Sequence, residues 1–230
     1  MPVRPALSGE SPLLAASEAM RRWVAPSERP RILLVARWPI GPIRAHLLAN
    51  YSALYAAGFR FTFVGPAGEA LEHLQTAFDN IDGLDFVAAP VEGRRCQLWS
   101  TIRALLREGS FGLMHSHGLT AAVHAALANL STGVPHLVTL HQLLRPNQFS
   151  GWFGCLKRWM LQRALQQADA IVLANDEARV NLLEHVPALR SRAHRLFALA
   201  GDKKAERLTA LLQLLAARAP LILPSESMAA

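Results

Sequence analysis

Cysteine is scarce in this sequence, and its apolar runs are short. The 230 residues include two cysteines, Cys96 and Cys155, and no C-x-x-C pair, which excludes a disulfide-dense secreted scaffold and favours a reducing compartment. The most apolar stretch, residues 208–223, is interrupted by Arg218 and falls short of the about 20 residues that a membrane-spanning helix needs. The N-terminus has no long apolar segment of the kind found in signal peptides. We therefore expect a cytoplasmic protein without a spanning helix.

Charged residues are also few, and they are unevenly distributed. They make up 18% of the chain against 51% hydrophobic residues, a balance that excludes an intrinsically disordered chain. The net charge is +7, and residues 150–218, with 11 basic and 6 acidic side chains, contribute +5 of it. Such a segment could bind nucleic acid, an anionic membrane or a phosphate-bearing substrate. Because its basic residues are interleaved with Leu and Ala and no nucleic-acid-binding motif is present, we expect no nucleic-acid partner.

Short apolar runs alternate with segments of helical periodicity along most of the chain. The predicted strands are residues 31–36, 59–64, 84–88, 111–115, 136–141 and 170–174, with 195–199 as a further edge strand. The predicted helices are residues 43–55, 67–78, 97–106, 119–130, 152–168 and 202–217, with one more that begins at Asn175 or Asp176 and ends before Pro187.

This alternation, with short connections, predicts an α/β fold. Parallel strands joined by helices form a sheet that is covered on both faces, so we expect a Rossmann-like, doubly wound, mostly parallel sheet of about six to seven strands. We expect one domain over residues 31–218, between an N-terminal tail (1–30) and a C-terminal tail (219–230).

Ligands of open parallel sheets bind outside the carboxyl ends of the strands, so the loops after the strands are the candidate site. The first loop contains Gly41 and is followed by Arg44 near a helix start, where free N–H groups attract anions. The spacing is not G-x-G-x-x-G, and Pro42 removes one N–H group. Two interpretations remain: an anion-binding helix start and a tight structural turn.

Histidines stand at the ends of the fourth and fifth predicted strands. The fourth ends in His115-Ser116-His117-Gly118, where strand alternation places both imidazoles on one side. A zinc site needs about three or four ligands, and no Cys or carboxylate is spaced to complete one, so we expect no metal. We expect His117 and Gly118 to contact a substrate or form a turn, and His141 to contact a substrate or to be structural. No G-x-S-x-G elbow is present, which argues against a hydrolase triad.

The predicted helix over residues 152–168 has an unusually wide apolar arc. Trp152 and Trp159 extend this arc beside Lys157 and Arg158. Aromatic rings next to cationic groups are typical of a membrane interface. Burial against a second layer of the fold explains the arc as well, so both interpretations stand.

Four stretches in the same order resemble the N-terminal half of a family 4 glycosyltransferase. They are RILLVARWPIGPIRAHLL, LMHSHG, VPHLVTLHQL and GWFGCLKRWMLQRALQQADAIVLANDEARVNLLE, and the resemblance covers residues 31–187. Members of that family are retaining GT-B enzymes built from two Rossmann-like domains. The resemblance implies that the N-terminal domain binds the acceptor and that the C-terminal domain holds the nucleotide-sugar.

The resemblance also implies residue roles. Gly41 matches the glycine loop that faces the donor phosphates, with Arg44 in the same inter-domain cleft, although Pro42 departs from the family's Gly-Gly pair. His117 and Gly118 match the H-x-H-G turn. His141 matches the histidine near the transferred sugar and is the candidate catalytic residue.

After the position of Pro187 the family leads into a second domain with a cation pair for the diphosphate, whereas this sequence continues through residues 195–201 and one helix. The resemblance therefore predicts the acceptor-binding half of a transferase that moves a sugar from a nucleotide-sugar to a glycan or lipid-linked acceptor in polysaccharide biosynthesis. It would act with a separate donor domain and without a metal or other cofactor. The alternative is a non-catalytic module that binds a glycan, a protein partner or the inner face of the cell membrane.

Overall fold

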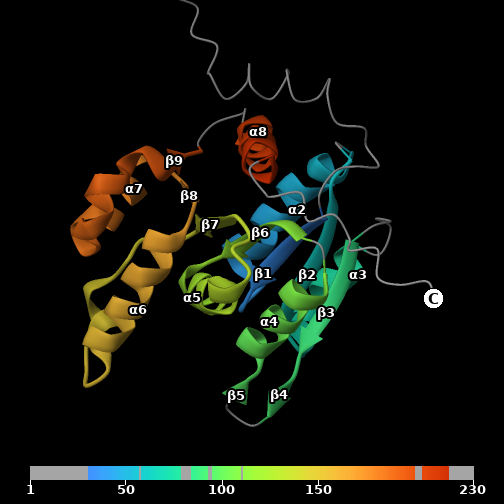
Figure 1. Ribbon diagram of the computed structural model, residues 1–230, viewed down its shortest axis with the longest axis horizontal. Coiled ribbons are helices and arrows are strands. Elements are labelled where there is room, and N and C mark those ends of the chain that lie inside the picture. Colours follow the sequence, from blue (N-terminus) through green and yellow to red (C-terminus); the bar gives the residue numbers. More distant parts are fainter. Residues whose placement is uncertain are drawn as a thin grey trace, which may run out of the picture.

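The computed structural model describes residues 31–56, 58–78, 84–92, 95–109, 111–199 and 204–217. The two predicted tails lie outside the described residues. Within the described part, seven parallel strands form one sheet (Figure 1). Their spatial order is β3 (Leu84–Ala89), β2 (Arg60–Pro66), β1 (Arg31–Ala36), β6 (Phe111–His117), β7 (His136–Leu140), β8 (Ala170–Leu173) and β9 (Leu196–Ala198).

Helices cover both faces of this sheet. One face carries α2 (Gly41–Ala56), α3 (Glu69–Ala77) and α8 (Lys204–Ala216). The other face carries α4 (Leu98–Glu108), α5 (Leu119–Ala128), α6 (Gly154–Gln167) and α7 (Asp176–His185). The predicted α/β class and doubly wound architecture are confirmed.

The covering of the central strand β1 on both faces explains why its residues after Arg31 are all apolar. Ile32 and Leu34 pack against the helices of one face, and Leu33 and Val35 pack against those of the other. Successive side chains of a strand point to opposite faces, so a strand covered on both sides needs a continuous apolar run.

Several local predictions also hold. Asn175 caps α7, because its Oδ1 accepts a hydrogen bond of 2.9 Å from the backbone N–H of Ala178. The predicted edge strand is β9, and the leucine stripe of α8 is buried, as the periodicity indicates. None of the helices in the described residues is long and apolar enough to cross a membrane.

Other element boundaries differ from the prediction near the candidate site. Strand β6 runs to His117, two residues further than expected, and β7 ends at Leu140, so that His141 is the first residue after the strand. Helix α2 begins at Gly41, because Pro42 fits the first turn of a helix, where its missing N–H group has no partner to lose. The hairpin of β4 (Val91–Glu92) and β5 (Arg95–Cys96) was not predicted, since two-residue strands carry no alternation signal.

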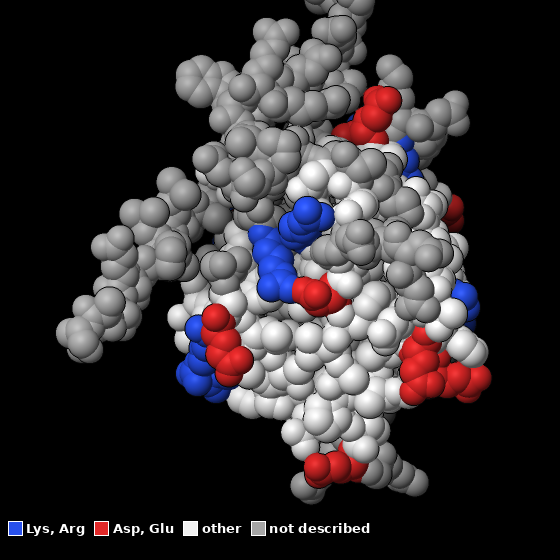
Figure 2. Space-filling model, turned by 90° about the vertical axis from the view of Figure 1, so that its right-hand side faces the viewer, with Lys and Arg blue, Asp and Glu red and all other residues white. Residues whose placement is uncertain are grey.

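Charges of both signs occur together on the β3 side of the molecule. Figure 2 shows Lys and Arg beside Asp and Glu on this face, separated by uncharged surface. Arg31 on β1 forms an ion pair with Asp85 on β3. This face therefore shows no continuous basic surface in its described part.

Candidate functional site

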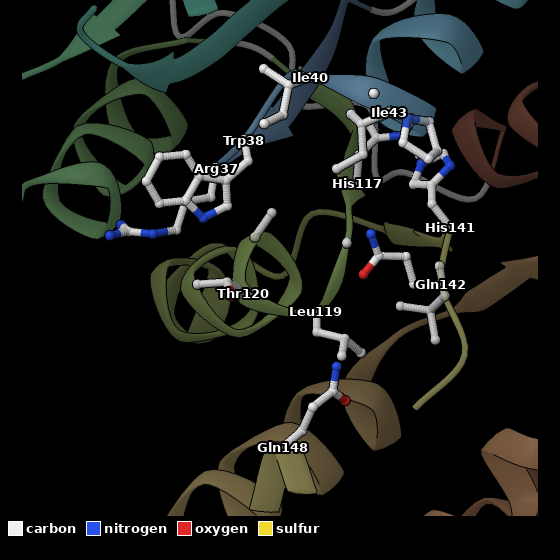
Figure 3. A pocket seen from close by; sticks show the side chains of 15 residues that line it. Arg37, Trp38, Ile40, Ile43, His117, Leu119, Thr120, His141, Gln142 and Gln148 are labelled. Carbon is white, nitrogen blue, oxygen red and sulfur yellow. The ribbon is translucent and has the colours of Figure 1, made fainter. Parts of the chain in front are cut away.

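A pocket of about 460 Å³ opens at the carboxyl ends of β1, β6 and β7 (Figure 3). From β1 the chain proceeds to β2 and β3 on one side and then crosses to β6 on the other, so the strand order reverses between β1 and β6. Ligands of doubly wound sheets bind at such a switch point. The pocket is lined by Gly41 and Gly118 and by the side chains of Arg37, Trp38, Ile40, Pro42, Ile43, His117, Leu119, Thr120, Ala121, Leu140, His141, Gln142 and Gln148.

The two glycines of the pocket begin helices with positive φ angles. Gly41 has a φ of +53° at the start of α2, and Gly118 has a φ of +86° at the N-cap of α5. A Cβ at Gly118 would lie 3.5 Å from Ile43 Cδ1, whereas a Cβ at Gly41 would have no described atom within 4 Å. Glycine is therefore favoured at Gly41 by backbone conformation alone.

The structure brings Gly41, His117, Gly118 and His141 into one pocket, but it does not bring Arg44 there. Arg44 lies on α2 and lines a separate shallow depression with His73 and Thr76 of α3.

His117 is part of a line of hydrogen-bonded side chains that runs from the core to the pocket. Thr139 Oγ1 lies 2.7 Å from His115 Nε2, and His115 Nδ1 lies 2.6 Å from the Tyr51 hydroxyl. That hydroxyl lies 3.0 Å from His117 Nε2, and His117 Nδ1 lies 3.2 Å from His141 Nε2. We call these five residues the histidine chain. It ends at the pocket, where His117 and His141 stack with ring centroids 5.5 Å apart.

Two polar side chains of α2 lie beside His117 and His141 and were missed in the sequence. Tyr51 is a link of the histidine chain, and the ring of His46 lies 4.9 Å from the ring of His141. A signal was available: His46 and Asn50 are polar, yet they occupy the helical stripe of the apolar residues Leu47 and Leu54. Polar groups on a buried stripe indicate a buried polar network.

His46 and the three histidines of the histidine chain stay neutral at neutral pH. Burial lowers the pKa of His46 to about 3 and that of His141 to about 4, with Lys204 adding to both shifts and His141 also to that of His46. Burial, reinforced by the neighbouring rings, holds the pKa values of His115 and His117 well below their ordinary range. Burial also raises the pKa of Tyr51. The site therefore offers hydrogen-bond donors and acceptors without formal charge.

Metal binding has no support in the described geometry. Within the described ranges, no group of three or more His, Cys, Asp or Glu residues is arranged to hold a metal ion. His115 and His117 use both ring nitrogens, and His141 uses Nε2, on Tyr51, Thr139 and one another.

The predicted apolar arc over residues 152–168 divides into two parts. Its C-terminal part, with Leu161, Ala164 and Leu165, is buried in the core. Its N-terminal part is exposed: Trp152 by 93%, Phe153 by 61%, Leu156 by 51% and Trp159 by 59%. Burial against a second layer therefore accounts for the first part only.

The cations beside these aromatic rings are exposed as well. Lys157 and Arg158 lie on the surface of α6, and Arg158 donates a hydrogen bond of 3.0 Å to the carbonyl of His185 at the end of α7. Helix α6 contains no acidic residue. We call Trp152, Phe153, Leu156, Lys157, Arg158 and Trp159 the α6 surface.

Solved structures with a similar fold include a protein in complex with UDP-glucose, a glycosyltransferase and a sugar-nucleotide epimerase. Anabaena HepE in complex with UDP-glucose matches with a TM-score of 0.56 and 15% identity over 74% of this chain and 43% of its own. A glycosyltransferase of Rickettsia africae matches with a TM-score of 0.55 and 13% identity over 75% and 43%. A UDP-N-acetylglucosamine 2-epimerase matches with a TM-score of 0.53 and 17% identity over 79% and 48%. The fold is thus that of an N-terminal-type domain of a GT-B glycosyltransferase.

Sequence comparison gives the family. Residues 40–196, more than half of the chain, match Glycosyltransferase Family 4, and the chain belongs to that family. The α-maltose-1-phosphate synthase of Mycolicibacterium smegmatis is 34% identical over 82 residues, which are 34% of this chain and 21% of that protein. The chain spans less than half of the length of each of these relatives.

Proposed function

We propose that this domain binds the acceptor in a retaining glycosyl transfer that moves a sugar from a nucleotide-sugar to a glycan or a lipid-linked acceptor. The observation that carries this proposal is the pocket at the β1–β6 switch point, where the stacked rings of His117 and His141 meet the glycine turn at Gly41. Neutral imidazoles suit the hydroxyl groups of a sugar, which donate and accept hydrogen bonds. Apolar walls such as Ile43 and Leu119 suit its C–H faces.

A nucleotide-sugar is the donor class that we propose. The support is family membership and the fold shared with HepE, whose structure contains UDP-glucose. We propose no resident metal or other cofactor, and we place the reaction in polysaccharide biosynthesis.

The donor diphosphate needs cations, and we propose that a separate donor domain supplies them. Leaving-group charge in such a transfer is usually stabilised by preorganised cationic groups. Among the described residues that line the pocket, Arg37 is the single cation, and its guanidinium lies over the Trp38 ring, 5.2 Å from the centroid. Figure 3 shows Arg37 on the side of the pocket opposite His117 and His141.

Reconstitution tests this function. The purified chain is incubated with UDP-glucose and with oligosaccharide or polyprenyl-phosphate acceptors, alone and with the donor domain of a two-domain family member. We expect product only when the donor domain is present. In that mixture His141→Ala should lower turnover about tenfold or more, as loss of a hydrogen bond to substrate does, while the exposed His73→Ala should not.

The outcomes separate the parts of the proposal. Turnover by the chain alone would contradict the need for a separate donor domain. A reconstituted mixture that neither binds acceptor nor forms product from any of a panel of nucleotide-sugars would contradict the transfer function.

Membrane contact is a second candidate function, and the exposure of the α6 surface favours it. Four large apolar side chains, two just before α6 and two on it, project into solvent beside two cations, and the helix has no acidic residue. Such a surface fits the interface of an anionic bilayer, where aromatic rings enter the headgroup region and cations meet lipid phosphates. We propose that the α6 surface binds the inner face of the cell membrane, where a lipid-linked acceptor would reach the pocket.

A further inference from the structure

The histidine chain restricts where its protons lie. Each of its three imidazoles is neutral, because burial keeps the pKa values of His115, His117 and His141 low, so each ring has one N–H group. The hydroxyl of Tyr51 has one proton and touches two rings, at His115 Nδ1 and His117 Nε2. It can therefore donate to one ring and must accept from the other.

This condition couples the rings. If Tyr51 donates to His117 Nε2, then His117 has its proton on Nδ1 and donates to His141 Nε2, which leaves the proton of His141 on Nδ1. In the same arrangement His115 donates from Nδ1 to Tyr51. If Tyr51 donates the other way, all three protons lie on Nε2. The three histidines therefore share one tautomer.

Thr139 selects between the two directions. When the protons lie on Nδ1, the Thr139 hydroxyl donates to His115 Nε2, and every hydrogen within the chain is used. In the reverse direction His115 donates to Thr139, and the buried hydroxyl hydrogen then has no other acceptor in the described part of the protein. A buried donor without a partner costs about 1–3 kcal/mol. The direction from Thr139 toward the pocket is therefore favoured.

We infer that Thr139, His115, Tyr51 and His117 are positioning residues that hold His141 as the Nδ1–H tautomer, with that N–H group free to donate to an oxygen atom of the ligand. Among the imidazole nitrogens of the histidine chain, His141 Nδ1 is the only one without a hydrogen bond from the described residues. His141 also lines the pocket. That the oxygen belongs to a sugar rests on the proposed function. In this tautomer Nδ1 donates and cannot accept the proton of an acceptor hydroxyl, so His141 binds and orients substrate and is not the general base.

His46 provides an internal reference beside the chain. Asn50 Nδ2 donates to the backbone carbonyl of His46 at 2.6 Å and faces His46 Nδ1 at 3.3 Å. Two donors would otherwise face each other across this 3.3 Å, so Nδ1 of His46 accepts and its proton lies on Nε2, which is buried without a hydrogen-bond partner among the described residues. His46 and His141, neighbours with centroids 4.9 Å apart, should therefore have opposite tautomers.

Long-range ¹H–¹⁵N correlation spectra of the histidine rings test the inference directly. In the ¹⁵N-labelled full chain at neutral pH, we expect a protonated Nδ1 and an unprotonated Nε2 at His115, His117 and His141, and the opposite pattern at His46. A protonated Nε2 or a doubly protonated ring at any of the three chain histidines would overturn the inference. The measurement uses neither ligand nor turnover, so its failure is distinct from failure of the transferase function.

A variant separates positioning from packing. Tyr51→Phe keeps the ring that packs on Phe61, with centroids 5.2 Å apart, but removes the hydroxyl between His115 and His117. We expect the ¹⁵N signals of His117 and His141 to shift, while those of His136, which bonds Ser116 outside the chain, stay in place and report an intact fold. The matched control is Tyr55→Phe, on the next turn of α2, which should leave all these signals unchanged. Unchanged His141 signals in Tyr51→Phe would show a purely structural tyrosine and overturn the inference.

Discussion

At the scale of single residues, the candidate site combines one position set by backbone conformation with others set by hydrogen bonding. Gly41 has a positive φ where the chain passes from the β1 loop into α2. His117 and His141 lie where two strands end side by side, since His117 pairs with Thr139 in the β6–β7 register. The strand-end rule therefore identified the residues of the pocket that follow strands.

Substitution at Gly41 should reveal a purely conformational cost. We expect Gly41→Ala to lower the free energy of unfolding by about 1–2 kcal/mol, the cost of the left-handed conformation for an L-residue. Gly41→Asn should cost less, because Asn tolerates this region better. Urea denaturation measures both variants. Equal losses for Ala and Asn would contradict the argument.

Gly65 offers a contrast in which space, not conformation, is limiting. Its φ is not in the left-handed region, and a Cβ there would lie 3.1 Å from the Ala36 carbonyl oxygen and 3.2 Å from Phe63 Cε1. Gly65→Ala should therefore destabilise the protein through crowding between β2 and β1, and Gly65→Asn should destabilise it more, the reverse of the order expected at Gly41.

At the scale of elements, α6 is buried at its C-terminal end and exposed at its N-terminal end. Its C-terminal half contributes Leu161 and Leu165 to the core, and its N-terminal half, together with Trp152 and Phe153 just before it, presents the α6 surface. The sequence pattern could not locate this division. A helical wheel projects all turns onto one circle and loses the position along the axis at which a helix leaves the sheet.

Vesicle sedimentation tests the α6 surface. We expect the protein to partition more strongly onto vesicles of phosphatidylglycerol and phosphatidylcholine than onto phosphatidylcholine alone, with added salt weakening the binding. Trp152→Ala combined with Trp159→Ala should reduce partitioning about tenfold or more, through the lost apolar burial. Trp99→Ala is the control, because Trp99 is 39% exposed on α4, away from the α6 surface. Equal partitioning of the double variant and the wild type would contradict membrane contact.

At the scale of the whole molecule, the neutral histidines link folding to pH. A folded-state pKa of about 3 for His46 and His136, and of about 4 for His141, lies below the unfolded value of about 6.5. Unfolding therefore takes up protons below that unfolded value. The stability is fully present above about pH 6.5 and is lost as the pH falls toward the folded values.

We expect the free energy of unfolding to fall by about 1.4 kcal/mol per pH unit for each such histidine between about pH 6 and pH 5. Urea denaturation at several pH values measures this slope. His136→Gln should reduce this slope by about 1.4 kcal/mol per pH unit, the contribution of one buried neutral histidine. A free energy that is flat over this range would contradict the neutral network.

Sequence periodicity and turn chemistry determined most of the fold. Three features depend only on residues close together in the sequence: the apolar runs of the strands, the Asn175 cap and the leucine stripe of α8. The sequence alone therefore predicts them. The two-residue strands β4 and β5 were not visible, because so few residues show no period.

The tertiary structure decided the chemistry of the site. Tyr51 and His117 are 66 positions apart, and His46 and His141 meet only because α2 packs over the ends of β6 and β7. The same packing turns Arg44 away from the pocket and buries the imidazoles, which makes them neutral. The sequence by itself therefore determined that strands end in glycine and histidine. Which of those side chains share protons depends on long-range packing and desolvation, and only the fold supplies both.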